Sequence, residues 1–268
     1  MIQHEQRIST PEEFKDVFSH FYFTSNCTEK SIKKTLLPTF QTMMVFNFGT
    51  EALFESDQSQ IPIDKCVVLG PVKQAITYVL PVGSEILVAN FKEDAFYRFF
   101  GQAVLYNFSI HPDKLLQEDC FSSLWKDLKE IKSAEKRVEF ILEFCRPYLK
   151  IKDQTFSEIE NLDKNSSLNL IKILAEKNNQ SERNIQLKFK KNFGFTAKEM
   201  SRYQRFLKTF EFIQNQISDS KIIDWMEIVE QFGFYDQSQL IHDFQHYLNL
   251  SPTQFLKFQK EICFAKPQ

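Results

Sequence analysis

The C-terminal part of the chain contains an internal repeat, and no other feature of the sequence constrains the fold as strongly. When residues 181–203 are shifted by 55 positions, seven of them fall on residues of similar physical character. The pairs, in chain order, are Ser181/Asp236, Ile185/Leu240, Phe189/Phe244, Gly194/Asn249, Thr196/Ser251, Glu199/Gln254 and Tyr203/Phe258. Such self-similarity is typical of a supersecondary unit that occurs twice.

The paired residues match the positions at which helices begin, pack and end. The first pair can cap a helix N-terminus, and the second and third pairs place apolar residues four apart on one helix face. The fourth pair tolerates the left-handed conformation that ends a helix. Thr196-x-x-Glu199 and Ser251-x-x-Gln254 are capping boxes that open the next helix, and Pro252 suits its first position.

A shorter helix is predicted directly before each copy. The segment LNLIKILAEKNN precedes Ser181, and DWMEIVEQFGF precedes Asp236. Ala175 lies in the first of these helices, whereas Val229 lies in the second and Gly233 at its bend. A helix, a tight turn and a capped second helix form a helix-turn-helix. We therefore predict two helix-turn-helix units.

One long helix from Ala197 to Ile217 should join the two units. Its 21 residues give a length of about 31 Å, and the major grooves on one side of a DNA duplex recur about every 34 Å. Two recognition helices held at this separation could enter successive grooves. The apolar positions of the helix fit equally well with a core helix of a bundle.

The front of the chain has a different pattern. Short β-branched and aromatic runs, bounded by Gly, Pro or polar residues, predict strands; they are TMMVFNFGT, KCVVLGPV, AITYVLPVG and SEILVANF. A helical stretch is predicted for Phe121–Leu149, and no proline lies between Tyr148 and Ser251. The predicted fold class is α+β, with a β-rich sandwich or barrel, a helical connector and an all-α C-terminal domain.

Composition and motifs argue against several other classes of protein. The five cysteines are scattered without a CxxC pair, which fits a reducing cytoplasm. No signal peptide or membrane span is visible, and the six glycines form no phosphate-binding loop. His242 and His246 in HDFQH imitate a zinc-protease motif but lack a third ligand nearby. We expect no catalytic residue, metal or cofactor, and a surface or fold-stabilising role for Arg98 rather than binding of an anionic effector.

The charge is distributed unevenly along the helical half. Residues 164–208 contain 11 Lys and Arg against 3 Asp and Glu, whereas residues 209–268 contain 4 against 8. The basic excess of the first segment can attract a polyanion, although a solvated helical surface would give the same pattern.

The C-terminal sequence resembles the AraC/XylS class of transcriptional regulators over about residues 160–261. The resemblance is carried by LAEKNNQSERNIQLKFKKNFGFTAKEMSRYQRF and IVEQFGFYDQSQLIHDFQHYLNLSPTQF, and most specifically by GF-x-DQS. It implies a sequence-specific regulator that binds double-stranded DNA through residues 161–262. It further implies a sensory or dimerisation domain over residues 1–120, followed by a connector at 121–160. RNA polymerase, a small-molecule effector and a second copy of the chain are further partners that this class suggests.

The resemblance also identifies candidate DNA-binding residues. The first recognition helix is Glu182–Asn192 and the second is Gln237–Leu248. The candidates are Ser181, Arg183, Asn184, Gln186, Leu187, Lys190, Lys191, Gln237, Ser238, Gln239, Ile241 and His242. Arg can pair with guanine, Gln and Asn with adenine, and Ile can pack on a thymine methyl. The lysines lie where they could reach phosphates.

Four positions depart from the family pattern. Leu187 and His242 stand where the family usually has basic residues, Lys188 where it has an apolar residue and Val229 where it has alanine. Because the second half is also acidic, we expect the first unit to dominate DNA affinity. The alternative function is a protein-interaction or sensor protein whose degenerate helix-turn-helix domain does not bind DNA.

Overall fold

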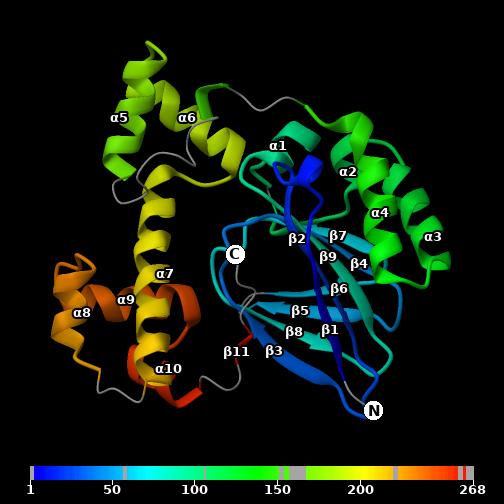
Figure 1. Ribbon diagram of the computed structural model, residues 1–268, viewed down its shortest axis with the longest axis horizontal. Helices are drawn as coiled ribbons and strands as arrows, with labels where there is room; N and C mark the ends of the chain where they lie inside the picture. Colours follow the sequence, from blue (N-terminus) through cyan, green and yellow to red (C-terminus); the bar gives the residue numbers. More distant parts are fainter. Residues whose placement is uncertain are drawn as a thin grey trace. The chain divides into compact units, whose positions relative to one another are not determined.

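The strands occupy the front of the chain and most of the helices follow, as Figure 1 shows for the computed structural model. It describes residues 3–56, 59–105, 107–150, 154–156, 167–219, 223–258 and 262–263. The chain divides into two units, whose main parts are Met1–Asp153 and Gln154–Phe189 with Phe195–Ile262. In the part of the chain described, no helix is long and apolar enough to cross a membrane.

The first unit contains two β-sheets. The six-stranded sheet has the order β1 (His4–Ile8), β2 (Phe18–Ser25), β9 (Glu85–Phe91), β4 (Met43–Asn47), β7 (Cys66–Leu69) and β10 (Ser109–Ile110). The five-stranded sheet has the order β11 (Ile262–Cys263), β3 (Ile32–Leu36), β8 (Ile76–Leu80), β5 (Ala52–Ser56) and β6 (Ser59–Ile63). The pairings of β4 with β7 and β9, and of β8 with β3 and β5, are antiparallel. The four predicted strands are confirmed as β4, β7, β8 and β9.

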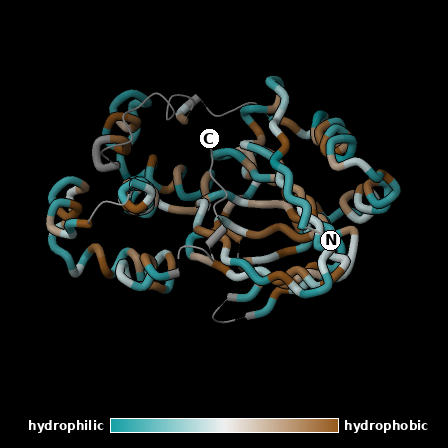
Figure 2. Tube along the Cα trace, turned by 60° about the horizontal axis from the view of Figure 1, so that its bottom comes forward, coloured by the Kyte–Doolittle hydropathy of each residue, from teal (hydrophilic) through white to brown (hydrophobic). Residues whose placement is uncertain are grey.

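Alternation along β4 shows why this inner strand of the six-stranded sheet is buried on both faces. Met44 and Phe46 belong to one hydrophobic cluster, which also contains side chains of three helices. Met43 and Val45 belong to a second cluster, shared with the five-stranded sheet. Because successive side chains of a strand point to opposite faces, a strand between two apolar layers is hydrophobic at nearly every position. In Figure 2, brown stretches of the tube run through the sheets, with white and teal residues between them.

The helices of the first unit cover one face of the six-stranded sheet. They are α1 (Ala95–Phe100), α2 (Asp113–Leu116), α3 (Cys120–Glu130) and α4 (Ala134–Cys145), with short 3-10 turns at Glu12–Phe14 and Arg146–Tyr148. The single helical stretch predicted for Phe121–Leu149 is therefore interrupted, because Ile131 is extended and Ser133 caps α4 by accepting a hydrogen bond from Lys136 N at 3.3 Å.

The region expected to be a connector contributes to this core. Phe121, Leu128 and Ile141 are buried in the same cluster as the strands of the six-stranded sheet. A 3-10 turn follows at Gln154–Phe156. Residues 151–153 and 157–160 of the expected connector lie outside the described residues.

The second unit is helical. It contains α5 (Ser167–Lys177), most of α6 (Glu182–Phe193), α7 (Ala197–Ser218), α8 (Trp225–Gln231), α9 (Gln237–Leu248) and α10 (Pro252–Phe258). The end of α6, within Lys190–Gly194, is grouped with the first unit. Figure 1 shows α7 as the long helix, with α5 and α6 near its N-terminal end and α8 to α10 toward its C-terminal end. The predicted joining helix, Ala197 to Ile217, is confirmed to within one residue.

The two apolar pairs of the repeat are buried. Ile185 and Phe189 are 0% and 1% exposed, and Leu240 and Phe244 are both 0% exposed. In the second copy, the Phe206 ring of α7 lies 5.3 Å from the Phe244 ring, measured between centroids. The aromatic residues of the repeat therefore form the core that fastens α9 to α7.

The predicted helix boundaries are also confirmed. Thr196 and Glu199 form a complete capping box, and Ser251 and Gln254 exchange the same two hydrogen bonds, at 2.8 and 3.2 Å. Gly194 and Asn249 have positive φ angles of 80° and 57°. Local sequence thus dictates where each helix of the repeat begins and ends.

Candidate nucleic-acid interface

The turns of the two helix-turn-helix units have the same hydrogen-bonding geometry. In the first turn, Asn179 has a φ of 53° and Gln180 N donates to Ala175 O at 2.9 Å. In the second, Gly233 has a φ of 68° and Phe234 N donates to Val229 O at 3.0 Å. A left-handed residue followed by a hydrogen bond back to the helix is a common way to end a helix. The larger side chain of Val229 is accommodated, since it is only 5% exposed.

The second turn is one residue longer than the first. Tyr235 lies between the bend and the N-cap residue Asp236, and its side chain is 91% exposed. The extra residue explains why Val229 precedes its cap by seven positions whereas Ala175 precedes Ser181 by six. The inserted residue points into solvent, so the helices on either side keep their packing.

The candidate residues of α6 lie at its start and along its exposed surface. Ser181 Oγ accepts a hydrogen bond from Asn184 N at 3.2 Å, so Ser181 is the N-cap residue. Arg183 and Gln186 are exposed, and Leu187 is 62% exposed. The two lysines, Lys190 and Lys191, are exposed in the last turn. Asn184 is partly engaged, because its Nδ2 donates to Gln180 Oε1 at 2.9 Å.

The candidate residues of α9 differ in their exposure to solvent and in their hydrogen bonds. Gln237 and Ser238 are exposed, and Ile241 is 40% exposed. Gln239 is half-buried, and its Oε1 accepts a hydrogen bond from Tyr235 N at 2.8 Å, which ties this side chain to the turn. His242 is exposed, but its Nδ1 lies 2.9 Å from Arg202 Nη2.

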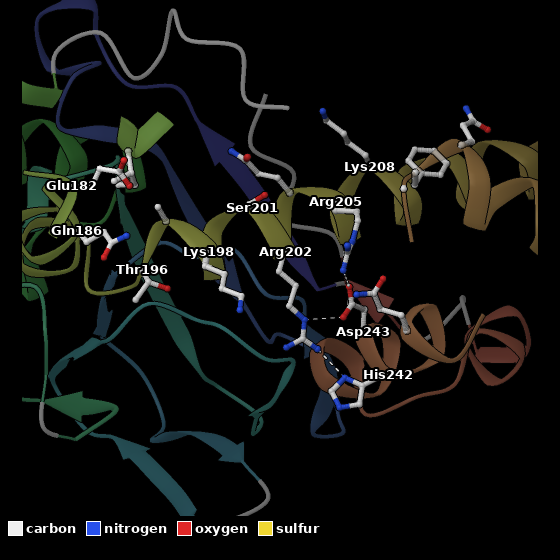
Figure 3. A pocket seen from close by; sticks show the side chains of 17 residues that line it. Glu182, Gln186, Thr196, Lys198, Ser201, Arg202, Arg205, Lys208, His242 and Asp243 are labelled. Atoms are coloured by element: carbon white, nitrogen blue, oxygen red, sulfur yellow. Dashed lines mark hydrogen bonds and ion pairs between the residues drawn. The ribbon is translucent and has the colours of Figure 1, made fainter. Parts of the chain in front are cut away.

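The two recognition helices and α7 enclose a groove of about 1060 Å³, which we call the interhelical groove. It is drawn in Figure 3, and its lining residues are Ile171, Glu182, Gln186, Thr196, Ala197, Lys198, Ser201, Arg202, Gln204, Arg205, Lys208, Gln231, Phe232, Gly233, Gln239, His242 and Asp243. Three of the candidate residues, Gln186, Gln239 and His242, are brought together here.

The side of α7 that lines the groove is basic. Lys198, Arg202, Arg205 and Lys208 are spaced by four, three and three residues, which places them on one helix face. The prediction for this helix considered only its apolar positions, so these residues were missed. The signal was present in the sequence, because all four belong to the basic segment 164–208 and recur at helical spacing.

A buried carboxylate at the second recognition helix pairs with two of these arginines. Asp243 is 1% exposed. Its Oδ1 accepts from Arg202 Nε at 2.7 Å and its Oδ2 from Arg205 Nη2 at 2.9 Å, as the dashed lines in Figure 3 mark. The Arg205 guanidinium also lies over the Phe234 ring, 4.4 Å from its centroid. Asp243 therefore joins α9 to α7 by ion pairs, beside the aromatic contact between Phe206 and Phe244.

The contact with Arg202 identifies which ring nitrogen of His242 accepts a hydrogen bond. A guanidinium can only donate hydrogen bonds, so Nδ1 of His242 accepts and the ring proton lies on Nε2. His242 therefore presents an N–H donor at Nε2.

Burial, and then the charge of Arg202, lower the pKa of the neighbouring His246, which favours its neutral form.

Two alternatives weighed from the sequence can be compared with the geometry. In the described part of the chain, no group of three or more His, Cys, Asp and Glu residues could hold a metal ion. Arg98 donates to Asp94 Oδ1 at 2.9 Å, to Lys150 O at 3.2 Å and to Asp16 O. These contacts tie together three segments of the first unit, which favours the fold-stabilising role over the surface one.

The described elements define a protein with a β-sandwich unit and a unit of two helix-turn-helix motifs joined by one long helix. This is the architecture that the AraC/XylS resemblance implies.

No protein-family model matches the chain, and no curated protein matches it. Among solved structures, the chain is similar to ToxT from Vibrio cholerae, with 13% identity and a TM-score of 0.41 over 95% of this chain and 98% of that one. A ToxT structure with bound unsaturated fatty acid has 12% identity and a TM-score of 0.38 over 87% and 96%. The AraC-like transcriptional activator CuxR has 7% identity and a TM-score of 0.22 over 96% and 84%.

Proposed function

We propose that this protein is a sequence-specific DNA-binding transcription regulator, which inserts α6 and α9 into successive major grooves. The observation that carries the proposal is the helix-turn-helix that occurs twice, with α7 joining the two copies. The 22 residues of α7 span about 33 Å, close to the spacing of about 34 Å between major-groove faces on one side of a duplex.

The exposed side chains of both helices fit base recognition. Arg183 and Gln186 are long polar groups that can form paired hydrogen bonds with guanine and adenine, respectively. Leu187 is 62% exposed on an otherwise polar surface, and contact with a thymine methyl would remove it from water. The Nε2–H of His242 matches acceptors such as guanine N7 and O6.

We assign a positioning role to the lysines at the end of α6. Lys190 and Lys191 are exposed in its last turn, where they can neutralise phosphates without reading sequence. The first helix-turn-helix thereby supplies most of the non-specific affinity, and α9 supplies orientation and a second, weaker block of readout.

We further assign effector sensing or self-association to the β-rich unit. Its hydrophobic clusters consist of residues from the first unit alone, so DNA binding should survive its removal. A truncation that lacks residues 1–160 should therefore keep most of the DNA affinity. Loss of binding by a truncation that still folds would contradict this division of labour.

The experiment that tests the function is fluorescence anisotropy with a random-sequence duplex pool at several salt concentrations, followed by recovery and sequencing of bound duplexes. We expect a slope of several units in log K against log salt and an enriched motif with two blocks. Enrichment of one block would assign readout to the first helix-turn-helix alone. Absence of binding at low salt, with effector candidates also tested, would refute the proposal and favour the protein-interaction alternative.

Two substitutions separate base readout from phosphate contact. Gln186→Ala should weaken binding by about 1–3 kcal/mol and relax the preference at one base position. Lys190→Ala should weaken binding to all duplexes alike and lower the salt slope by about 1. Asn215→Ala and Lys257→Ala, at positions outside the interhelical groove, are the matched controls and should leave both quantities unchanged.

A further inference from the structure

We propose that the long helix α7 is itself a DNA-binding element, whose basic face binds the phosphodiester backbones that border the minor groove between the two recognition helices. This inference rests on the proposed function, because it assumes a duplex that spans α6 and α9. The residues are Lys198, Arg202, Arg205 and Lys208.

The placement of these four cations is the first support. They are ten residues apart from first to last, or about 15 Å along the helix axis. All four line the interhelical groove together with Gln186 from α6 and His242 from α9. A duplex that contacts both recognition helices must therefore pass over this face of α7.

The geometry of DNA supplies the second support. Between two major-groove faces on the same side of a duplex, the minor groove faces the protein. Its opening is about 6 Å wide and is bordered by one sugar–phosphate backbone on each side. A 15 Å row of cations is long enough to contact both backbones. No base has to be reached, because phosphate contacts position a protein without reading sequence.

The electrostatic balance of the groove favours an anion. Four basic side chains line it against two acidic ones, Glu182 and Asp243. Asp243 is already enclosed by Arg202 and Arg205 and is 1% exposed. The carboxylate therefore holds the two arginines in place and presents little negative charge to a ligand.

The two lysines at the ends of the row allow the inference to be tested without disturbing that pairing. Lys198 and Lys208 are exposed, whereas the side chains of Arg202 and Arg205 are 32% and 25% exposed and bonded to Asp243. Replacing both lysines removes two charges from the groove and leaves the contact between α7 and α9.

The experiment compares full-length Lys198→Ala/Lys208→Ala with wild type in salt-dependent anisotropy, on a selected duplex and on a random one. The charge-matched control is Lys126→Ala/Lys257→Ala, two exposed lysines that do not line the groove. If each lysine neutralises one phosphate, the slope of log K against log salt should fall by about 1.8. Affinity for both duplexes should fall by the same factor, and the control should match wild type.

A second variant, Lys198→Arg/Lys208→Arg, keeps the charges and should keep the slope. The inference is overturned if the alanine variant has the slope of wild type while wild type binds, and the proposed function then stands without it. It is also overturned if the alanine variant loses preference for the selected duplex at an unchanged slope, because the lysines would then read bases. If wild type binds no duplex at low salt, both the inference and the proposed function fail.

Discussion

The charged contact between α7 and α9 can be tested by the substitution Asp243→Asn, which removes one negative charge with almost no change of volume. In the native protein, the carboxylate is 1% exposed and accepts hydrogen bonds from Arg202 at 2.7 Å and Arg205 at 2.9 Å. An asparagine can satisfy one of these donors, but its amide group turns a second donor toward the other guanidinium. The two arginines then face each other without a counter-charge.

The expected cost follows from the burial of the partners. Removing one partner of a buried ion pair typically costs about 3–5 kcal/mol. Here the arginine side chains are 32% and 25% exposed, and water can solvate part of the uncompensated charge. We therefore expect a loss of about 2–3 kcal/mol in the free energy of unfolding of the helical unit. For a unit of this size, the loss corresponds to a Tm decrease of about 10–15 °C.

The assay is urea and thermal unfolding followed by far-UV circular dichroism, with Asp236→Asn as the matched control. Asp236 is the N-cap of the same helix, and asparagine caps about as well as aspartate, so the control should change stability by less than about 0.5 kcal/mol. A double-mutant cycle of Asp243→Asn with Arg205→Met should show coupling of at least about 0.5 kcal/mol. Equal stability of the two asparagine variants, with no coupling, would refute the reasoning.

Three further predictions concern turns, a buried histidine and helix caps. Gly233 has a φ of 68° and open space around it. Because an L-residue is strained in this left-handed conformation, Gly233→Ala should lower the free energy of unfolding in urea by about 1 kcal/mol. Gly233→Asn should lower it by less, because Asn179 holds the equivalent bend at a φ of 53°. His20 is 4% exposed, and burial, then the charge of Arg7, lower its pKa from 6.5 to about 4. The unfolded chain thus binds this proton first on acidification, and stability should fall between pH 6.5 and 4, by up to about 3 kcal/mol; a His20→Gln variant with an unchanged pH slope would contradict this. Thr196→Ala and Ser251→Ala should each lower stability by about 1 kcal/mol in thermal unfolding, and equal Tm values for variants and wild type would show that the caps contribute nothing.

The parts of the fold that could be predicted from sequence are those that local chemistry decides. Caps, left-handed helix ends and apolar spacing depend on residues within one or two turns, so the boundaries of α7 and α9 were predictable. Strand β2 was not predicted as a strand, although its FSHFYFTS sequence is aromatic. It pairs with β9, more than 60 residues further along the chain, and no local pattern indicates such a partner.

The same limit explains what was missed at the candidate site. The exposed candidate residues of α6 follow from their place on an amphipathic helix. The burial of Asp243 does not, because aspartate is rarely buried unless it is paired, and its partners lie about 40 residues earlier, on another helix. Helical spacing could have identified the basic face of α7, but only the fold shows that this face lines the same groove as both recognition helices.

The structure also changes how the uneven charge of the helical half should be interpreted. Dividing the sequence after Lys208 gives a basic first segment and an acidic second one, but this division cuts through the middle of α7. Arg202 and Arg205 are counted with the first segment, although their carboxylate partner, Asp243, belongs to the second. The acidity of the second segment is thus partly neutralised by cations of the first. The basic face of α7 lies between the two recognition helices and belongs to both units. DNA affinity should therefore depend on the basic face of α7 in addition to the lysines of α6. A helix α9 without net positive charge can still read bases, because α7 supplies phosphate contacts beside it.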